Sequence, residues 1–206
     1  MTHIKTKQSE TFTDWLRDKA TVITGPVARW LHKLRIHPNT VTLAGLFLSG
    51  VSAAVLATGR ISLGGVLLLL TSSVDAFDGS LARLSGKQSR FGAFLDSSLD
   101  RCSDGVLLFG LLPQLLSTGR ELEIYLTFVA LLGFVMVSYT RARAEGVGYD
   151  CQTGILTRVP RILVLGIGLA LGQVLLTLIV LAVFSWITVF QRISYVYRQA
   201  EEEAGE

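Results

Sequence analysis

The sequence has little charge for its size. Charged residues make up 17% of its 206 residues, whereas 50% are hydrophobic, and the formal net charge is only +3. A soluble domain rarely combines so little charge with so many apolar residues. Long apolar runs indicate several membrane helices instead. We therefore expect an all-α integral membrane protein.

Cysteine and histidine are also scarce. Cys102 and Cys151 lie far apart and have neither metal-site nor redox-pair spacing, so we expect two reduced thiols. His3, His32 and His37 show no ligand spacing either, and we expect them at the surface. If the protein binds a metal, these residues do not supply the site.

Internal repeats, low-complexity tracts and long Pro/Gly-rich linkers are missing as well. We therefore expect a single domain over residues 1–206. Within it we predict a juxtamembrane amphipathic segment at 1–36, a six-helix bundle at 37–198 and an acidic tail at 199–206. The first ten residues are polar, which argues against a cleaved signal peptide.

Six apolar stretches, separated by turn residues, predict the bundle. They run over residues 39–58, 61–84, 90–116, 121–145, 158–172 and 173–198. The fifth stretch is short for a full span, so the boundary between the last two is the least defined. Gly168 and Gly172 form a GxxxG pair there, which allows close helix packing but arises often by chance in Gly-rich membrane proteins.

Residues 10–35 carry apolar side chains at helical spacing with basic residues between them. Trp15 and Trp30 belong to the apolar set. This pattern predicts an amphipathic helix at the membrane surface, with its tryptophans at headgroup level and its basic face toward anionic lipid. A soluble helix packed on a partner is the alternative.

The positive charges predict the orientation. Six spans would place both termini on one side, and 16 of the 19 Lys and Arg residues would lie on that side. By the positive-inside rule it is cytoplasmic. We therefore expect a multi-pass protein of the inner or plasma membrane, with both termini in the cytoplasm.

Four carboxylates stand out toward the end of the second stretch and near the start of the third. Asp75 and Asp78 are three residues apart, and Asp96 and Asp100 are four apart, so each pair lies on one helix face. A charge at the bilayer centre costs about 3 kcal/mol on insertion scales. Like charges close together also raise each other's pKa. Divalent cations would compensate, and oxygen-only ligands suit Mg²⁺, Mn²⁺ or Ca²⁺.

Intramembrane acids can also mark an ion path, as in a cation transporter. Here the acids gather at one end of two helices, and no acidic series reaches the far side. A non-catalytic scaffold would give no reason to keep four carboxylates near hydrocarbon. A metal site near the cytoplasmic headgroups is therefore the favoured interpretation.

The stretch from position 75 to 100 reads D-x2-D-G-x2-A-R-x8-G-x3-D-x3-D and resembles the signature of the CDP-alcohol phosphotransferase (phosphatidyltransferase) family. Eight positions match in order and spacing: Asp75, Asp78, Gly79, Ala82, Arg83, Gly92, Asp96 and Asp100. The HPNTVT segment at 37–42 and the six-helix plan are also similar. The resemblance covers nearly the whole chain.

This resemblance implies an enzyme that moves a phosphatidyl group from a CDP-lipid, such as CDP-diacylglycerol, to an alcohol hydroxyl and releases CMP. It implies Mg²⁺ or Mn²⁺, with two ions held by Asp75, Asp78, Asp96 and Asp100. Asp100 would also be the general base, a role that a carboxylate beside a metal can fill. The family further implies a homodimer.

The family's CDP-lipid site maps onto Asp75, Gly79, Ala82, Arg83 and Gly92. Gly79 and Ala82 are small and would let the cytidine and its phosphates approach the second helix. Arg83 would bind a nearby phosphate or ribose. Gly92, one turn before Asp96, would leave room over the metals. The resemblance therefore implies a CDP-lipid, a polar alcohol phosphate acceptor and the lipid bilayer as partners, and no nucleic acid.

Within the family, three segments resemble the prokaryotic phosphatidylinositol-phosphate synthases: SYTRARAEG, GILTRVPRIL and ITVFQRISYVYRQ. The chain departs from that group at three positions. Arg141 replaces a Lys, and Thr157 and Pro160 each replace a Glu. The Lys-to-Arg exchange replaces a compact ammonium group with a planar guanidinium at a position expected to bind phosphate.

Four arginines at the expected cytoplasmic helix ends would suit an acceptor that carries a phosphate: Arg141, Arg158, Arg161 and Arg192. Inositol 1-phosphate is the first choice of acceptor and glycerol 3-phosphate, as in phosphatidylglycerophosphate synthases, the second. The alternative is that these arginines bind lipid headgroups. We expect Asp104 to pair with a basic group such as Arg101, and Glu145 with Arg141.

Overall fold

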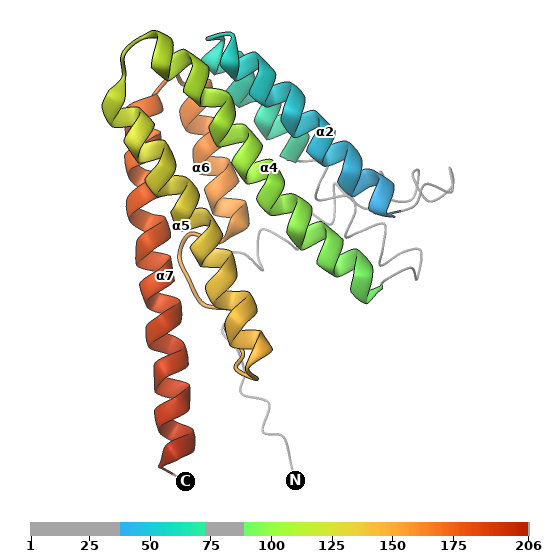
Figure 1. Cartoon of the computed structure of the whole chain (residues 1–206), viewed down its shortest axis with the longest axis vertical. Helices are drawn as coiled ribbons and strands as arrows, with labels where there is room; N and C mark the ends of the chain where they lie inside the picture. The colour runs from blue at the N-terminus through green and yellow to red at the C-terminus, as the bar shows by residue number, and fades with distance from the viewer. Residues whose placement is uncertain (1–37, 73–88, 206) are drawn as a thin grey trace.

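A computed structural model describes residues 38–72 and 89–205, and their regular structure is entirely helical, without a strand. The helices are α2 (Pro38–Ala57), an unlabelled helix at Ile61–Ser72, α4 (Arg90–Ser117), α5 (Glu121–Gly146), α6 (Arg158–Ala170) and α7 (Val174–Ala204) (Figure 1). The all-α prediction is confirmed. The expected N-terminal amphipathic helix and the expected end of the second helix lie outside the described residues.

The turn between α6 and α7 settles the boundary that was least defined from the sequence. Gly172 has a φ of +71°, in the left-handed region that glycine adopts most easily. It therefore ends α6 and is not part of a continuous helical GxxxG face. Gly168 still lies on α6, where an added Cβ would collide with the Thr177 side chain of α7.

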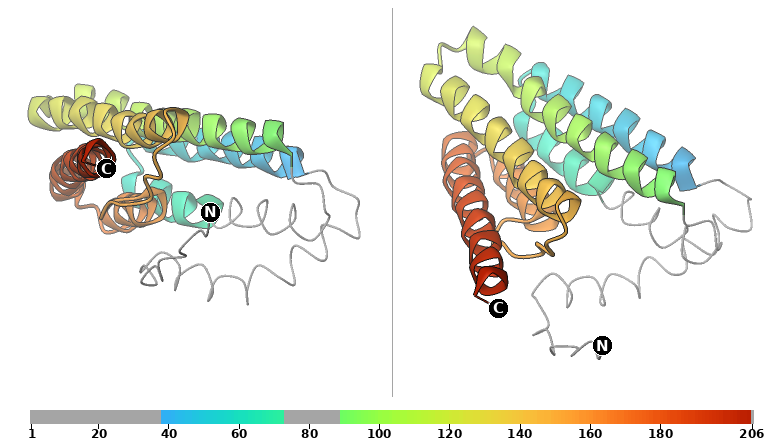
Figure 2. Two further views of the ribbon diagram at one scale, coloured as in Figure 1. Left: turned by 90° about the horizontal axis from the view of Figure 1, so that it is seen from below. Right: turned by 60° about the horizontal axis from the view of Figure 1, so that its bottom comes forward.

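Along the chain the helices alternate in direction, so that α2, α4 and α6 run one way and α5 and α7 run the other (Figure 1). Neighbours pack in the order α2, α4, α5, α7, α6 (Figure 2). The Ile61–Ser72 helix packs beside α6. The two helices are so close at Gly166 that an added Cβ there would lie 2.5 Å from the Leu69 side chain. Gly110 lets α4 approach α2 closely, since a Cβ there would lie 2.7 Å from the backbone of Ala53.

The two halves of the bundle differ in chemistry. The apolar core lies toward the short α4–α5 and α6–α7 turns and includes Leu111, Phe134, Leu169 and Leu178, all fully buried. The opposite half, toward the N-termini of α4 and α6, contains buried charged side chains. Burial of apolar surface therefore stabilises one end, whereas at the other end the buried charges of Asp100, Asp104 and Arg161 are compensated in ion pairs.

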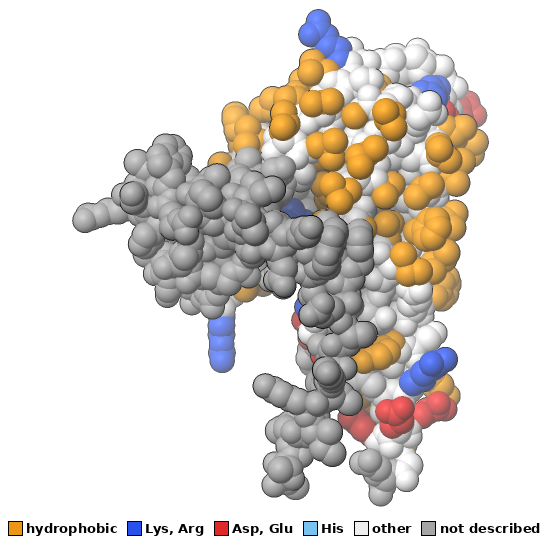
Figure 3. All heavy atoms as spheres, turned by 180° about the vertical axis from the view of Figure 1, so that it is seen from behind, with side chains coloured by type: hydrophobic (Ala, Val, Ile, Leu, Met, Phe, Trp, Pro, Cys, Tyr) orange, Lys and Arg blue, Asp and Glu red, His pale blue; other side chains and the backbone are white. Residues whose placement is uncertain are grey.

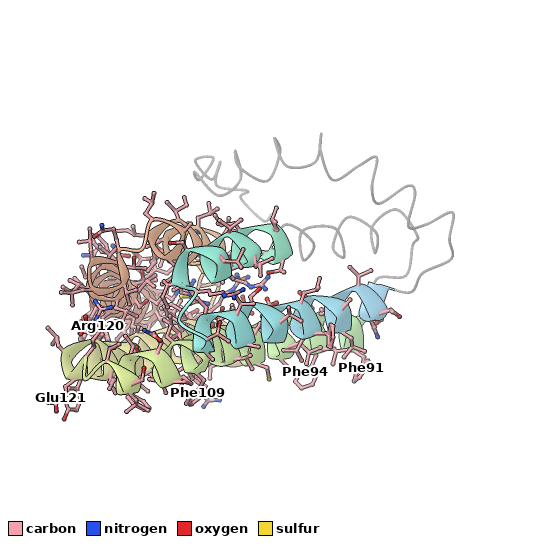
Figure 4. The ribbon with its side chains drawn as sticks, turned by 90° about the horizontal axis from the view of Figure 1, so that it is seen from above. Phe91, Phe94, Phe109, Arg120 and Glu121 are labelled. Carbon is pink, nitrogen blue, oxygen red and sulfur yellow. The ribbon has the colours of Figure 1, made fainter. Side chains whose placement is uncertain are left out.

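The outer surface is apolar over much of its area (Figure 3). On α4, Phe91, Phe94 and Phe109 point outward and are 63%, 65% and 52% exposed (Figure 4). Among the described residues, three helices are long and apolar enough to cross a membrane: Asn39–Ala57, Glu121–Gly146 and Val174–Ala204. This surface is what lipid contact requires.

Helix α7 extends beyond the expected end at residue 198 and continues to Ala204. Two long-range hydrogen bonds hold this extension. The Tyr149 hydroxyl donates to Glu203 at 2.9 Å, and the Gln199 amide donates to the Asp150 carbonyl at 3.0 Å. The loop after α5 therefore supports the acidic end of α7, whose glutamates remain exposed.

Candidate active site

The start of α4 sets the positions of the predicted acidic residues. Ser89 caps the helix, and its hydroxyl accepts a hydrogen bond from the Gly92 N–H at 2.9 Å. From this start, helical spacing places Asp96, Asp100 and Asp104 along one face. Burial increases along the series: Asp96 is half-buried, Asp100 is 9% exposed and Asp104 is 1% exposed.

Asp100 is held by an arginine from α6. Arg158 Nη2 lies 2.6 Å from Asp100 Oδ1, and Arg101 Nη2 lies 3.5 Å from Asp100 Oδ2. The side chains of Arg158 and Asp100 are 30% and 12% exposed. Asp100, which the family resemblance implies is the general base, is therefore a partly accessible carboxylate that faces two arginines.

One turn deeper, Asp104 makes a second ion pair with α6. Arg161 Nη2 donates to Asp104 Oδ2 at 2.6 Å, and both side chains are at most 2% exposed. The Arg161 guanidinium also lies 4.2 Å from the centre of the Phe134 ring on α5, a cation–π contact. Arg101 Nε is 3.6 Å from the same Asp104 oxygen. The expected Arg101–Asp104 pair is confirmed, but Arg161 is the nearer partner.

The other two predicted acceptor arginines lie on α5 and α7. Arg141 is exposed and pairs with Glu145 at 2.7 Å, as expected from their spacing. Arg192 is 4% exposed, and it donates through Nε to the Thr153 carbonyl at 2.9 Å and through Nη1 to the Val137 carbonyl. Arg192 therefore joins α7 to α5 and to the loop at 147–157.

That loop packs tightly on α7. The Leu156 N–H donates to the Thr188 hydroxyl at 3.0 Å, and the Ile155 N–H donates to the Gln191 side chain at 3.2 Å. Cys151, which belongs to this loop, is fully buried. Burial raises the pKa of its thiol, although the positive charge of Arg192 opposes the shift.

The remaining predicted site residues lie outside the described residues: Asp75, Asp78, Gly79, Ala82 and Arg83. Gly92 is described, and a Cβ there would lie 3.0 Å from Ser89 Oγ and 3.4 Å from Asn39 Oδ1. Within residues 38–72 and 89–205, no group of three His, Cys, Asp or Glu residues could hold a metal ion. Two of the four predicted ligands fall outside those ranges.

The described half of the cluster has the chemistry that a hard divalent cation needs. Asp96 and Asp100 offer only oxygen ligands, from one face of one helix, which suits Mg²⁺ or Mn²⁺. Two guanidinium groups also lie within 3.5 Å of the Asp100 oxygens, so this carboxylate faces positive charge on its described side. The residues present therefore fit the metal expected from the sequence.

Sequence reasoning did not foresee the pairing between α4 and α6. A signal was available, because Asp100 and Asp104 are four residues apart and Arg158 and Arg161 are three apart, so each pair repeats about once per turn. Matching repeats of opposite charge on two helices favour parallel ion pairs. Sequence alone did not say that α6 would face α4.

Comparisons with known proteins identify the family of this chain. Residues 35–194 match the family model for CDP-alcohol phosphatidyltransferase. The archaetidylinositol phosphate synthase of Pyrococcus horikoshii is 35% identical over 176 residues, which are 85% of this chain and 91% of that protein. The phosphatidylinositol phosphate synthase of Corynebacterium glutamicum is 35% identical over 159 residues, 75% of this chain and 72% of that protein.

Two crystal structures of the Mycobacterium tuberculosis phosphatidylinositol phosphate synthase are also similar. The structure with CDP-DAG bound has a TM-score of 0.79 and 30% identity, over 85% of this chain and 94% of that one. The structure with manganese and citrate has a TM-score of 0.78 and 31% identity, over 84% and 88%. From its matched residues and its helical arrangement, this chain belongs to the CDP-alcohol phosphatidyltransferase family.

Proposed function

We propose that this protein transfers a phosphatidyl group from CDP-diacylglycerol, or a related CDP-lipid, to the hydroxyl of inositol 1-phosphate and releases CMP. The observation that carries this proposal is the contact between Arg158 and Asp100. This contact places a guanidinium, which binds phosphate well, directly beside the carboxylate that would activate the hydroxyl. The names of the similar synthases support the same substrates.

Asp100 would act as the general base. An alcohol is a poor nucleophile until its proton is removed, and a carboxylate within hydrogen-bond reach can accept that proton. The oxygen would then attack the phosphorus that carries the lipid, and the bond from that phosphorus to CMP would break. The partial exposure of Asp100 supports this role, because a substrate hydroxyl must be able to reach it.

The proposed metal site consists of Asp75, Asp78, Asp96 and Asp100 and holds two Mg²⁺ or Mn²⁺ ions. When bound, such ions neutralise the charge on the pyrophosphate and on the departing CMP. Gly79, Ala82 and Arg83 would form the CDP-lipid site with Asp75 and Gly92.

The four arginines would divide their roles in acceptor binding. Arg158 is the nearest to the proposed base and is partly exposed, so it would bind the acceptor phosphate directly. Arg141 is exposed and could join it by leaving Glu145. Arg192 would contribute Nη2, which makes no hydrogen bond with a described residue. Arg161 is buried on Asp104, so we assign it an indirect role.

The proposed enzyme is a six-span protein of the plasma membrane, with its site and both termini in the cytoplasm. Its catalytic bundle is residues 37–198, between a juxtamembrane segment at 1–36 and the acidic end at 199–206. The distribution of Lys and Arg supports this orientation. A homodimer is proposed from the family resemblance.

The test is CMP release by purified protein with Mg²⁺ and CDP-diacylglycerol. Inositol 1-phosphate, glycerol 3-phosphate, serine and inositol are compared as acceptors, each with and without a chelator. We expect release with inositol 1-phosphate and none after chelation. Release with glycerol 3-phosphate alone would replace the proposed acceptor, and release unaffected by chelation would overturn the metal site.

A further inference from the structure

The two ion pairs between α4 and α6 differ in one respect that matters for ligand binding. Both have a 2.6 Å contact between an arginine nitrogen and a carboxylate oxygen. The inner pair, Asp104–Arg161, is closed off from solvent, with side chains 2% and 1% exposed. The outer pair, Asp100–Arg158, is 12% and 30% exposed. A ligand can therefore reach the outer pair but not the inner one.

The inner pair has a second reason to persist. The Arg161 guanidinium lies on the Phe134 ring, and its Nε and Nη1 atoms have no hydrogen-bond partner among the described residues. A buried guanidinium in that state depends on Asp104 for compensation, because separation would leave the Arg161 charge uncompensated away from water. The inner pair therefore holds α6 at a fixed depth on α4.

In the proposed function, each side chain of the outer pair has to bind something other than its partner. If the proposed function holds, Asp100 must bind a divalent ion and accept a proton, while Arg158 must bind the acceptor phosphate. A guanidinium bound to Asp100 competes with the metal ion for the same carboxylate. Separation of the two side chains would give a metal ion access to Asp100 Oδ1 and a phosphate access to the Arg158 guanidinium.

We propose that the Asp100–Arg158 pair is an exchangeable contact: Arg158 moves from Asp100 to the acceptor phosphate as the metal ions bind, while the Asp104–Arg161 pair stays closed and keeps α6 in register. This proposal rests on the proposed function. Metal ions and phosphate then bind cooperatively, because each removes the competitor of the other. By linkage, phosphate must raise metal affinity as much as metal raises phosphate affinity.

The experiment measures Mn²⁺ binding by electron paramagnetic resonance in detergent micelles, with and without inorganic phosphate. Formation of the Mn²⁺–phosphate complex is corrected with a protein-free titration. In Arg158→Gln the guanidinium nearest to Asp100 is removed, so Mn²⁺ affinity without phosphate rises about fivefold or more over wild type. Phosphate raises Mn²⁺ affinity in the wild type and has little effect in Arg158→Gln.

Arg101→Gln is the matched control. It removes the same charge from the other guanidinium near Asp100, at 3.5 Å, but from α4 itself. If loss of charge alone strengthened Mn²⁺ binding, both variants would gain alike. The exchange predicts a larger gain for Arg158→Gln, with the phosphate effect retained in Arg101→Gln. If Arg158→Gln does not fold, Arg158→Lys replaces it and shows a smaller change in the same direction.

The outcomes separate this proposal from the proposed function. Equal gains in the two variants, or a phosphate effect that persists in Arg158→Gln, would overturn the exchange and leave the metal site in place. Absence of Mn²⁺ binding in the wild type would overturn both. Tighter Mn²⁺ binding in Arg158→Gln alone, with loss of the phosphate effect, is the supporting result.

Discussion

Arg161 of α6 and Asp104 of α4 form a buried ion pair, with Nη2 and Oδ2 2.6 Å apart and the guanidinium stacked on Phe134. The sequence placed Arg161 among the residues for the acceptor phosphate. In the structure, Arg161 instead joins α6 to α4 through Asp104 and to α5 through Phe134. A residue so placed acts on catalysis through the geometry of α4 and α6.

Removal of one partner of this pair should destabilise the protein strongly. Asp104→Asn leaves the Arg161 charge buried without compensation, and loss of a buried partner costs about 3–5 kcal/mol. Glu145→Gln is the control, because it breaks an exposed pair of similar length, worth about 0.3–0.5 kcal/mol. Thermal unfolding in detergent measures both. Similar losses for the two variants would contradict a structural role for Asp104.

Asp100→Asn should separate binding from chemistry. The amide keeps the shape of the carboxylate but cannot accept the hydroxyl proton, so CMP release should fall by about 10²–10⁴-fold or more. CDP-lipid binding should persist, because most of the proposed contacts to the CDP-lipid lie elsewhere. Equilibrium binding and CMP release are measured on the same preparation. Turnover near that of wild type would remove Asp100 from the base role.

The helices were largely predictable because turn residues interrupt the apolar runs. The third stretch was expected at 90–116 and α4 is Arg90–Ser117; the fourth was expected at 121–145 and α5 is Glu121–Gly146. Local signals decide such ends: Ser89 caps α4, and Gly119, with a φ of +65°, lies in the turn after it. The end of α7 was missed, because Tyr149 and Asp150 hold it from a distant loop.

The shared helix face of Asp96 and Asp100 was predictable, but the α6 partners of Asp100 and Asp104 were not. Asp96 and Asp100 were identified from their spacing, since a helix places residues four apart on one face. The partners of Asp100 and Asp104 come from α6, 57 or more residues along the chain, and no local pattern fixes such a contact. Arg192 was expected to face phosphate, yet two of its nitrogens bind backbone carbonyls.

Arg192→Ala should loosen the loop at 147–157 as well as weaken acceptor binding. The substitution removes the bond to the Thr153 carbonyl in the loop and the bond to the Val137 carbonyl of α5, so the loop around Thr153 should loosen from α7 and expose Cys151. In the wild type, burial blocks this thiol and raises its pKa, so less thiolate is present at a given pH than for a free cysteine. Maleimide labelling of Cys151 in a Cys102→Ser background should therefore be slow and should accelerate in Arg192→Ala.

The kinetic arm of the same experiment compares KM values. Arg192→Ala should raise the KM for the acceptor far more than the KM for the CDP-lipid, because the proposed donor site lies on other helices. Equal increases in both, together with faster Cys151 labelling, would favour a purely structural role for Arg192. Unchanged labelling would contradict the loop contacts.

The Tyr149–Glu203 hydrogen bond should make the end of α7 sensitive to alkaline pH. The bond raises the pKa of Tyr149 above its ordinary value of about 10, because the donated proton is held by a carboxylate. Its contribution is thus complete at neutral pH and is lost as pH rises through the raised pKa. The probe is a nitroxide attached to Ala204→Cys in a chain without other cysteines. At pH 7 the nitroxide should be more mobile in Tyr149→Phe than with Tyr149 present. With Tyr149 present, it should become more mobile only above pH 10. Tyr197→Phe is the control, since Tyr197 bonds Glu201 within α7; equal effects of the two substitutions would show that the loop does not hold the helix.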